Sequence, residues 1–140
     1  MIREAGVSAP RVLFVCARNG GGSQMAAALL EGRAGAAVDV SSAGTDAGTS
    51  LNALSVESLR EVGIDIGGRR PRQLTAEMVA DADLVVVLGR EARVEGAGTP
   101  VETWETDEPS ERGVEGIERM RLVRDDIAAR VDALADRLGA

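Results

Sequence analysis

One cysteine stands where a short apolar run gives way to a glycine-rich loop. Cys16, the single cysteine among 140 residues, follows the run at residues 11–15 and precedes a six-residue loop, 17–22, that ends in three glycines. Such a loop can turn successive backbone N–H groups inward, and a helix starting just after it adds positive partial charge. Both features favour the thiolate, which is the nucleophilic form of a cysteine. The spacing therefore predicts a nucleophile inside an oxyanion-binding loop.

The composition excludes several other kinds of site. Histidine and lysine are absent, so all 16 cationic side chains are arginines. This excludes Ser-His-Asp and Cys-His arrangements, lysine Schiff bases and histidine-ligated metals. A single cysteine also excludes an internal disulfide and a cysteine-based zinc site. We therefore expect no metal and no bound cofactor.

Charge and hydropathy limit the partners. The net charge of −7 argues against binding to nucleic acid, which needs a positive surface. No apolar run is long enough to span a bilayer. We expect a cytoplasmic protein with neither nucleic-acid nor membrane partners.

The elements that must position the loop alternate between strand and helix patterns. Strands are expected at residues 11–16, 37–42, 84–88 and 99–104, and helices from Ser23 to about Gly32, over 51–62, from Thr75 to about Ala80, and over 113–138. In this pattern Ser23 caps the first helix and Gly32 ends it. The alternation predicts a parallel sheet with helices on both faces, whose ligands bind beyond the carboxyl ends of the strands.

The length fits one domain. We expect residues 1–10 to form a flexible leader, because they lack the apolar segment of a signal peptide. Residues 11–140 are expected to form the folded domain.

The segment VLFVCARNGGGSQMA at residues 12–26 resembles the phosphate-binding loop of the low-molecular-weight protein tyrosine phosphatases and of their relatives, the thiol-dependent arsenate reductases. Further similarity lies at residues 42–45, 59–65, 83–89, 107–109 and 121–127. The resemblance implies a single three-layer α/β domain of the flavodoxin-like kind, with a four-stranded parallel sheet and helices on both faces.

The resemblance also implies roles for individual residues. Cys16 attacks a tetrahedral oxyanion such as arsenate or phosphate, and Ser23 donates a hydrogen bond to its thiolate. A carboxylic acid beside a proline protonates the leaving group; Glu108 matches this acid by position and Asp107 by residue type. The implied substrate-binding residues are Ala17, Arg18, Asn19, Gly20, Gly21, Gly22 and Ser23.

One position departs from the family pattern. Six residues after Cys16, where the family has an arginine that holds two oxygens of the anion, this chain has Gly22. Two interpretations remain open. Arg18 swings over the anion and replaces the missing group, or the loop binds oxyanions weakly and the protein is catalytically impaired.

Two features favour a reductase over a phosphatase. Gln24 follows Ser23 where the phosphatases have proline, and Phe14 and Trp104 are the sole aromatic residues with which to grip phosphotyrosine.

Without further cysteines, a reductase needs an external low-molecular-weight thiol such as mycothiol and a glutaredoxin-like partner, as in the single-cysteine arsenate reductases of actinobacteria. We expect an arsenate reductase that serves arsenic resistance. The alternatives are a low-molecular-weight protein tyrosine phosphatase, which hydrolyses phosphomonoesters through a phosphocysteine, and an impaired oxyanion-binding protein.

Overall fold

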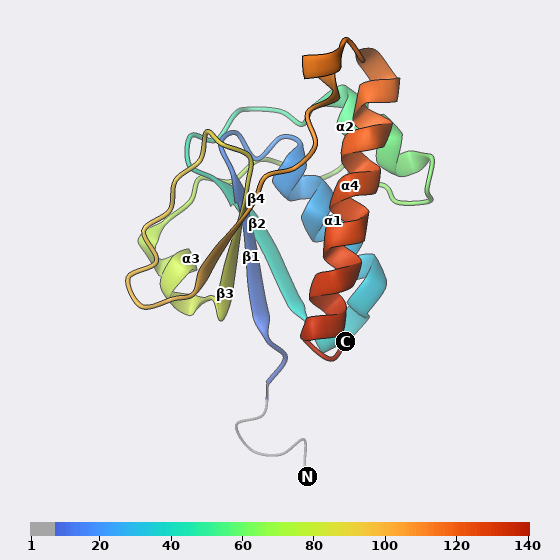
Figure 1. Cartoon of the computed structure of the whole chain (residues 1–140). Helices are drawn as coiled ribbons and strands as arrows, with labels where there is room; N and C mark the ends of the chain where they lie inside the picture. Colours follow the sequence, from blue (N-terminus) through green and yellow to red (C-terminus); the bar gives the residue numbers. More distant parts are fainter. Residues whose placement is uncertain (1–7) are drawn as a thin grey trace.

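A computed structural model describes residues 8–140 of the chain (Figure 1). Residues 1–7, most of the expected leader, lie outside this range. The elements follow in the order β1 (Arg11–Cys16), α1 (Gly22–Ala34), η1 (Gly35–Ala37), β2 (Asp39–Gly44), α2 (Ala53–Arg60), α3 (Ala76–Asp81), β3 (Leu84–Leu88), β4 (Val101–Trp104), η2 (Pro109–Arg112) and α4 (Gly116–Arg137).

The four strands form one parallel sheet in the order β2-β1-β3-β4, which is a flavodoxin-like order and confirms the expected fold class. β1 lies inside the sheet and is hydrogen-bonded to β2 on one side and β3 on the other. Because all strands run the same way, their carboxyl ends meet at the upper edge in Figure 1. Cys16 and Leu88 end neighbouring strands there.

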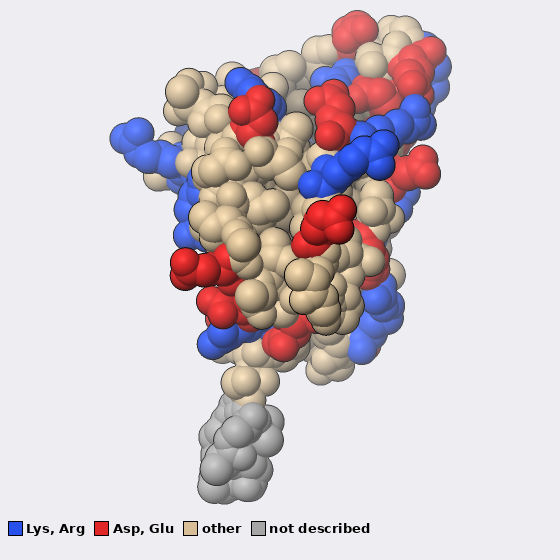
Figure 2. Space-filling view, turned by 90° about the vertical axis from the view of Figure 1, so that its left-hand side faces the viewer, with Lys and Arg blue, Asp and Glu red and all other residues tan. Residues whose placement is uncertain are grey.

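Helices cover both faces of the sheet, which gives the three expected layers. α1, α2 and α4 lie on one face and α3 on the other (Figure 1). Alternate side chains of β1 enter the two cores: Val12 and Phe14 face α1 and α4, whereas Leu13 and Val15 face α3. This double burial explains why the four residues 12–15 of the strand are all apolar. On the outer surface of the α3 side, acidic and basic side chains are interspersed (Figure 2).

The first helix differs from the sequence prediction at both ends. Gly21, not Ser23, is its N-cap, because the Ser23 hydroxyl is bonded to Cys16 and Asn19 instead. Gly32 lies within the helix, which tolerates one glycine at a cost of about 1 kcal/mol. The chain leaves the helix at Gly35, where φ is +56°.

The remaining boundaries shift by a few residues. β2 begins two residues later than expected, and β4 begins after Pro100 as an edge strand, as a proline requires. The Asn52 side chain caps α2, while Thr75 caps α3 as expected. None of the helices between residues 8 and 140 combines the length and apolarity that crossing a bilayer requires.

Candidate active site

The loop between β1 and α1 wraps around the sulfur of Cys16. The backbone N–H of Asn19 donates a hydrogen bond to the sulfur at 3.2 Å, and the hydroxyl oxygen of Ser23 lies 2.9 Å from it. Asn19 has a φ of +55°, the left-handed conformation that asparagine tolerates, and this conformation turns its N–H inward. Two groups that can stabilise negative charge thus lie against the sulfur.

Asn19 braces the loop from behind. Its fully buried amide donates to Ser23 Oγ at 2.7 Å and to Ser42 Oγ at 3.0 Å, and its oxygen accepts the backbone N–H of Arg72 at 2.9 Å and the amide of Gln24 at 3.2 Å. Because Asn19 already donates to the Ser23 oxygen, the hydroxyl hydrogen of Ser23 is left for the Cys16 sulfur.

Gly44 lets the end of β2 approach this loop closely. A Cβ on Gly44 would lie 2.7 Å from the carbonyl oxygen of Ala17 and 2.9 Å from the carbonyl carbon of Arg18. Backbone N–H groups just after it, those of Thr45 and Asp46, donate to the carbonyls of Cys16 and Ala17. Only glycine fits this contact. The bonds to Thr45 and Asp46 direct these two loop carbonyls toward β2.

The sulfur lies beside a cavity of about 710 Å³. The cavity is bounded by the loop, the start of α2, the end of β3, the segment after β4 and the first turns of α4; its lining includes Cys16, Ala17, Arg18, Gly20, Gly21, Gly22, Leu88, Arg90, Asp107, Glu108 and Arg119. Asn19 and Ser23 are buried behind the sulfur and do not line it.

The cavity has no aromatic wall among the residues that the structure describes. Phe14 and Trp104 instead pack against each other in the core, with ring centroids 5.7 Å apart. The arrangement therefore suits a small anion better than an aryl phosphate.

Position 22 lines the cavity and has room for a Cβ. A Cβ on Gly22 would meet only the side chain of Leu88, at 3.8 and 3.9 Å, which is ordinary van der Waals distance. The fold around the loop would thus accept a side chain at this position.

Both candidate acids line the cavity as ion-paired carboxylates. Arg119 donates from Nε and Nη2 to Glu108, both at 2.9 Å, and Ser110 Oγ donates to the same carboxylate at 2.7 Å. These bonds, that of Arg119 first, lower the pKa of Glu108 to about 2. Arg112 donates twice to Asp107 at 2.8 Å and lowers the pKa of that carboxyl as well. A carboxyl group held in this way does not carry a proton near neutral pH, so a general acid here must first exchange its partner.

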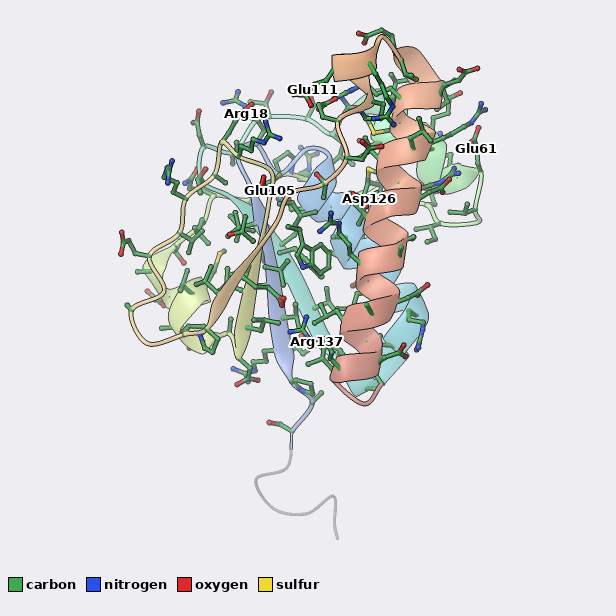
Figure 3. The ribbon with its side chains drawn as sticks, viewed as in Figure 1. Arg18, Glu61, Glu105, Glu111, Asp126 and Arg137 are labelled. Atoms are coloured by element: carbon green, nitrogen blue, oxygen red, sulfur yellow. The ribbon has the colours of Figure 1, made fainter. Side chains whose placement is uncertain are left out.

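The other two arginines of the cavity are more exposed. Arg18 donates to Asp46 at 2.7 Å with its side chain 63% exposed, so its expected reach over the anion stays a prediction. Arg90, 74% exposed, lies 3.9 Å from the carboxylates of Glu105 and Glu111. In Figure 3, Arg18 and Glu111 lie toward the end of the molecule where the strands finish.

Sequence reasoning did not identify Arg90 or Arg119 as site residues. Arg119 carried a weak signal, because a cation near the N-terminus of a helix faces the positive end of the helix dipole and needs an anionic partner there. In residues 8–140, no cluster of cysteine and acidic side chains is arranged to hold a metal ion.

The chain is similar to proteins of one known family. Residues 11–140 match the family described as low molecular weight phosphotyrosine protein phosphatase. An arsenate reductase from Brevibacillus brevis is 35% identical over 129 residues, which cover 89% of this chain and 93% of that protein.

Solved structures with the same fold include reductases and phosphatases. A thioredoxin-dependent arsenate reductase from Corynebacterium glutamicum superimposes with a TM-score of 0.79 at 30% identity, covering 96% of this chain but only 64% of that longer chain. An arsenate reductase in its phosphate-binding state gives 0.80 at 26% identity, covering 92% and 98% of the two chains. An arginine phosphatase from Geobacillus stearothermophilus gives 0.76 at 27% identity and 93% of each chain.

The match over residues 11–140 and the identity to a named arsenate reductase confirm the predicted resemblance and the predicted type of enzyme, reductase or phosphatase. This chain belongs to the low molecular weight phosphotyrosine protein phosphatase family, whose fold arsenate reductases share.

Proposed function

We propose that this chain is an arsenate reductase that uses Cys16 as its nucleophile and an external low-molecular-weight thiol as its reductant. The observation that carries the proposal is the single free sulfur beside a cavity without aromatic walls, held by the N–H of Asn19 and the hydroxyl of Ser23. The named arsenate reductases among its relatives support the same reaction.

The first step is an exchange of ligands at arsenic. The Cys16 thiolate attacks arsenate, an As–S bond forms, and one As–O bond breaks. Asp107 or Glu108 gives a proton to the departing oxygen, which leaves as water. The backbone N–H groups of residues 17–22, with Arg18, bind the remaining oxygens.

The second step transfers electrons. An external thiolate such as that of mycothiol attacks the Cys16 sulfur and forms a mixed disulfide, while the As–S electron pair stays on arsenic. Arsenic(V) becomes arsenic(III) and arsenite leaves. A second thiol, which a glutaredoxin-like protein can supply, releases the Cys16 thiolate. The external thiol is required because the chain has no second cysteine to form an internal disulfide.

The test is arsenate-dependent consumption of thiol. Wild-type protein with mycothiol and a glutaredoxin-like protein should oxidise thiol only when arsenate is present, and Cys16→Ser should abolish the reaction. Equal rates for wild type and Cys16→Ser would refute the proposal.

A phosphatase is the second candidate, favoured by the absence of an internal relay cysteine and by the phosphatases that share the fold. It would hydrolyse a phosphocysteine with water and need no thiol. Turnover of p-nitrophenyl phosphate without thiol, lost in Cys16→Ser, together with no arsenate-dependent thiol oxidation, would establish it.

A catalytically impaired oxyanion-binding protein is the third candidate, because Gly22 stands where the family has arginine. Wild type and Gly22→Arg would then both be inactive in the two assays. Activity gained in Gly22→Arg alone would show that the rest of the site is intact and that only the arginine was lost.

A further inference from the structure

Three arginines of the described chain line the cavity, and they differ in how they are held. Arg18 and Arg90 are mostly exposed, at 63% and 74%. Arg119 is 30% exposed and makes two hydrogen bonds of 2.9 Å to Glu108. A charge shielded from water acts more strongly on a neighbouring anion.

Ser55 of α2 links the anion-binding loop to the first turns of α4. A Cβ on Gly21 would lie 3.2 Å from Ser55 Oγ, and Ser55 Oγ in turn donates to the sulfur of Met120 at 3.6 Å. Arg119 immediately precedes Met120 on that helix and lines the same cavity as Gly22. Helix α4 therefore places a guanidinium in the lining of the cavity, whereas the loop has glycine at the position where the family has arginine.

We propose that Arg119 supplies the guanidinium that position 22 lacks, by leaving Glu108 for the bound oxyanion, and that the freed Glu108 protonates the departing oxygen. This inference rests on the proposed oxyanion chemistry at Cys16. It makes Glu108 the acid and makes the acid available only when an anion is bound.

The exchange replaces one paired anion with another. A tetrahedral dianion offers Arg119 the same two-pronged acceptor as the carboxylate, with more charge. Glu108 is not left without a partner, because Ser110 Oγ still donates to it at 2.7 Å. Once Arg119 has moved and an anion lies nearby, the pKa of Glu108 rises from about 2 toward or above its ordinary value of 4.5. A larger fraction of Glu108 is then protonated by the solvent, and this protonated form passes its proton to the departing oxygen.

Asp107 does not take part in such an exchange. Its partner Arg112 is absent from the lining of the cavity, so an entering anion does not compete for it. The backbone N–H of Asp107 is also fixed by Asp126 at 2.8 Å.

Sulfate binding tests the first half of the proposal, because sulfate is a tetrahedral dianion that does not react with the thiolate. Arg119→Ala should weaken sulfate binding at least about tenfold by calorimetry, and Arg119→Lys should recover part of the loss. Arg137 is the matched control: it makes a similar bidentate pair with Glu102, at 2.9 and 3.0 Å, near the other end of the same helix (Figure 3). Arg137→Ala should change the affinity by less than about twofold.

A carbon-13 NMR titration of the Glu108 carboxyl tests the second half. Saturating sulfate should raise the pKa of Glu108 in the wild type, and in Arg119→Ala the pKa should start high and change little. An unchanged pKa in the wild type, an unchanged sulfate affinity in Arg119→Ala, or no sulfate binding at all would overturn the inference.

Neither measurement needs thiol or turnover. Sulfate results as expected without arsenate reduction would refute the proposed function alone, and normal reduction with unchanged sulfate affinity in Arg119→Ala would refute only the role of Arg119.

Discussion

If Arg119 and a side chain at position 22 serve the same anion, their effects on catalysis cannot be independent. A double-mutant cycle with Gly22→Arg and Arg119→Ala measures that dependence directly. The first change is compatible with the fold, because a Cβ on Gly22 would meet Leu88 at 3.8 Å and the backbone there is not left-handed. The second removes one partly exposed ion pair, so both variants should fold.

The expected size of the change in kcat/KM follows from the hydrogen bonds that each substitution removes or adds. Removing one positioned donor to a transition-state oxyanion costs about 3 kcal/mol, or on the order of a hundredfold in rate. We therefore expect Arg119→Ala to lower kcat/KM for arsenate about a hundredfold. Gly22→Arg should gain less than about fivefold in the wild-type background, where Arg119 already holds the anion, but should restore Arg119→Ala to near wild type. The coupling energy between the two sites is then about 3 kcal/mol.

The assay is arsenate-dependent thiol oxidation, with circular dichroism melting of each variant to establish that it is folded. Gly22→Ala is the control, since it adds the Cβ without the guanidinium and should leave Arg119→Ala unrepaired. Additive effects would refute the reasoning: if Arg119→Ala loses the same factor with glycine or arginine at position 22, the two positions do not hold the same anion.

Three further results are expected. Ser23→Ala should slow alkylation of Cys16 by iodoacetamide at neutral pH several-fold, because it removes the hydroxyl 2.9 Å from the sulfur, and an unchanged rate would contradict that role. Asn19→Ala should lower the free energy of unfolding in urea by about 3 kcal/mol, since it leaves buried groups without partners; a loss below about 1 kcal/mol would show that the loop re-forms its bonds. Because the pKa of Glu108 is lowered to about 2 from 4.5, its pairing stabilises the fold above about pH 4.5, and this contribution is lost as the pH falls toward 2. Glu108→Gln should therefore reduce the fall in Tm across that window by a small amount, as expected for a partly exposed pair, and an equal fall in both proteins would contradict it.

The strands and the position of the nucleophile could be predicted from sequence because one local property decides each of them. The unbroken apolar run before Cys16 fits the inside of a parallel sheet, and Gly20 and Gly21 interrupt regular structure before α1 begins at Gly22. The first helix was harder to delimit. Gly32 and Gly35 look alike in sequence, and only tertiary packing decides which of them adopts the left-handed conformation.

The partners of the acids could not be predicted for a similar reason. Glu108 and Arg119 are eleven residues apart and meet only because η2 folds the chain back onto α4. The hydroxyl of Ser23 was expected to serve both the helix start and the thiolate. The structure gives it one of these, because α1 already begins at Gly22 and the Ser23 hydroxyl lies inside the helix, bonded to Cys16 and Asn19.

The nucleophile and the proposed acid lie in segments whose backbone amides are protected from solvent exchange to different degrees. Cys16 ends a strand paired on both sides, whereas the segment that carries Glu108 follows β4, a four-residue strand at the edge. Amide hydrogens of β1 should therefore exchange with solvent only through global unfolding, and those of residues 105–113 through smaller local openings. Low urea should then cause reversible inactivation before any loss of helical signal.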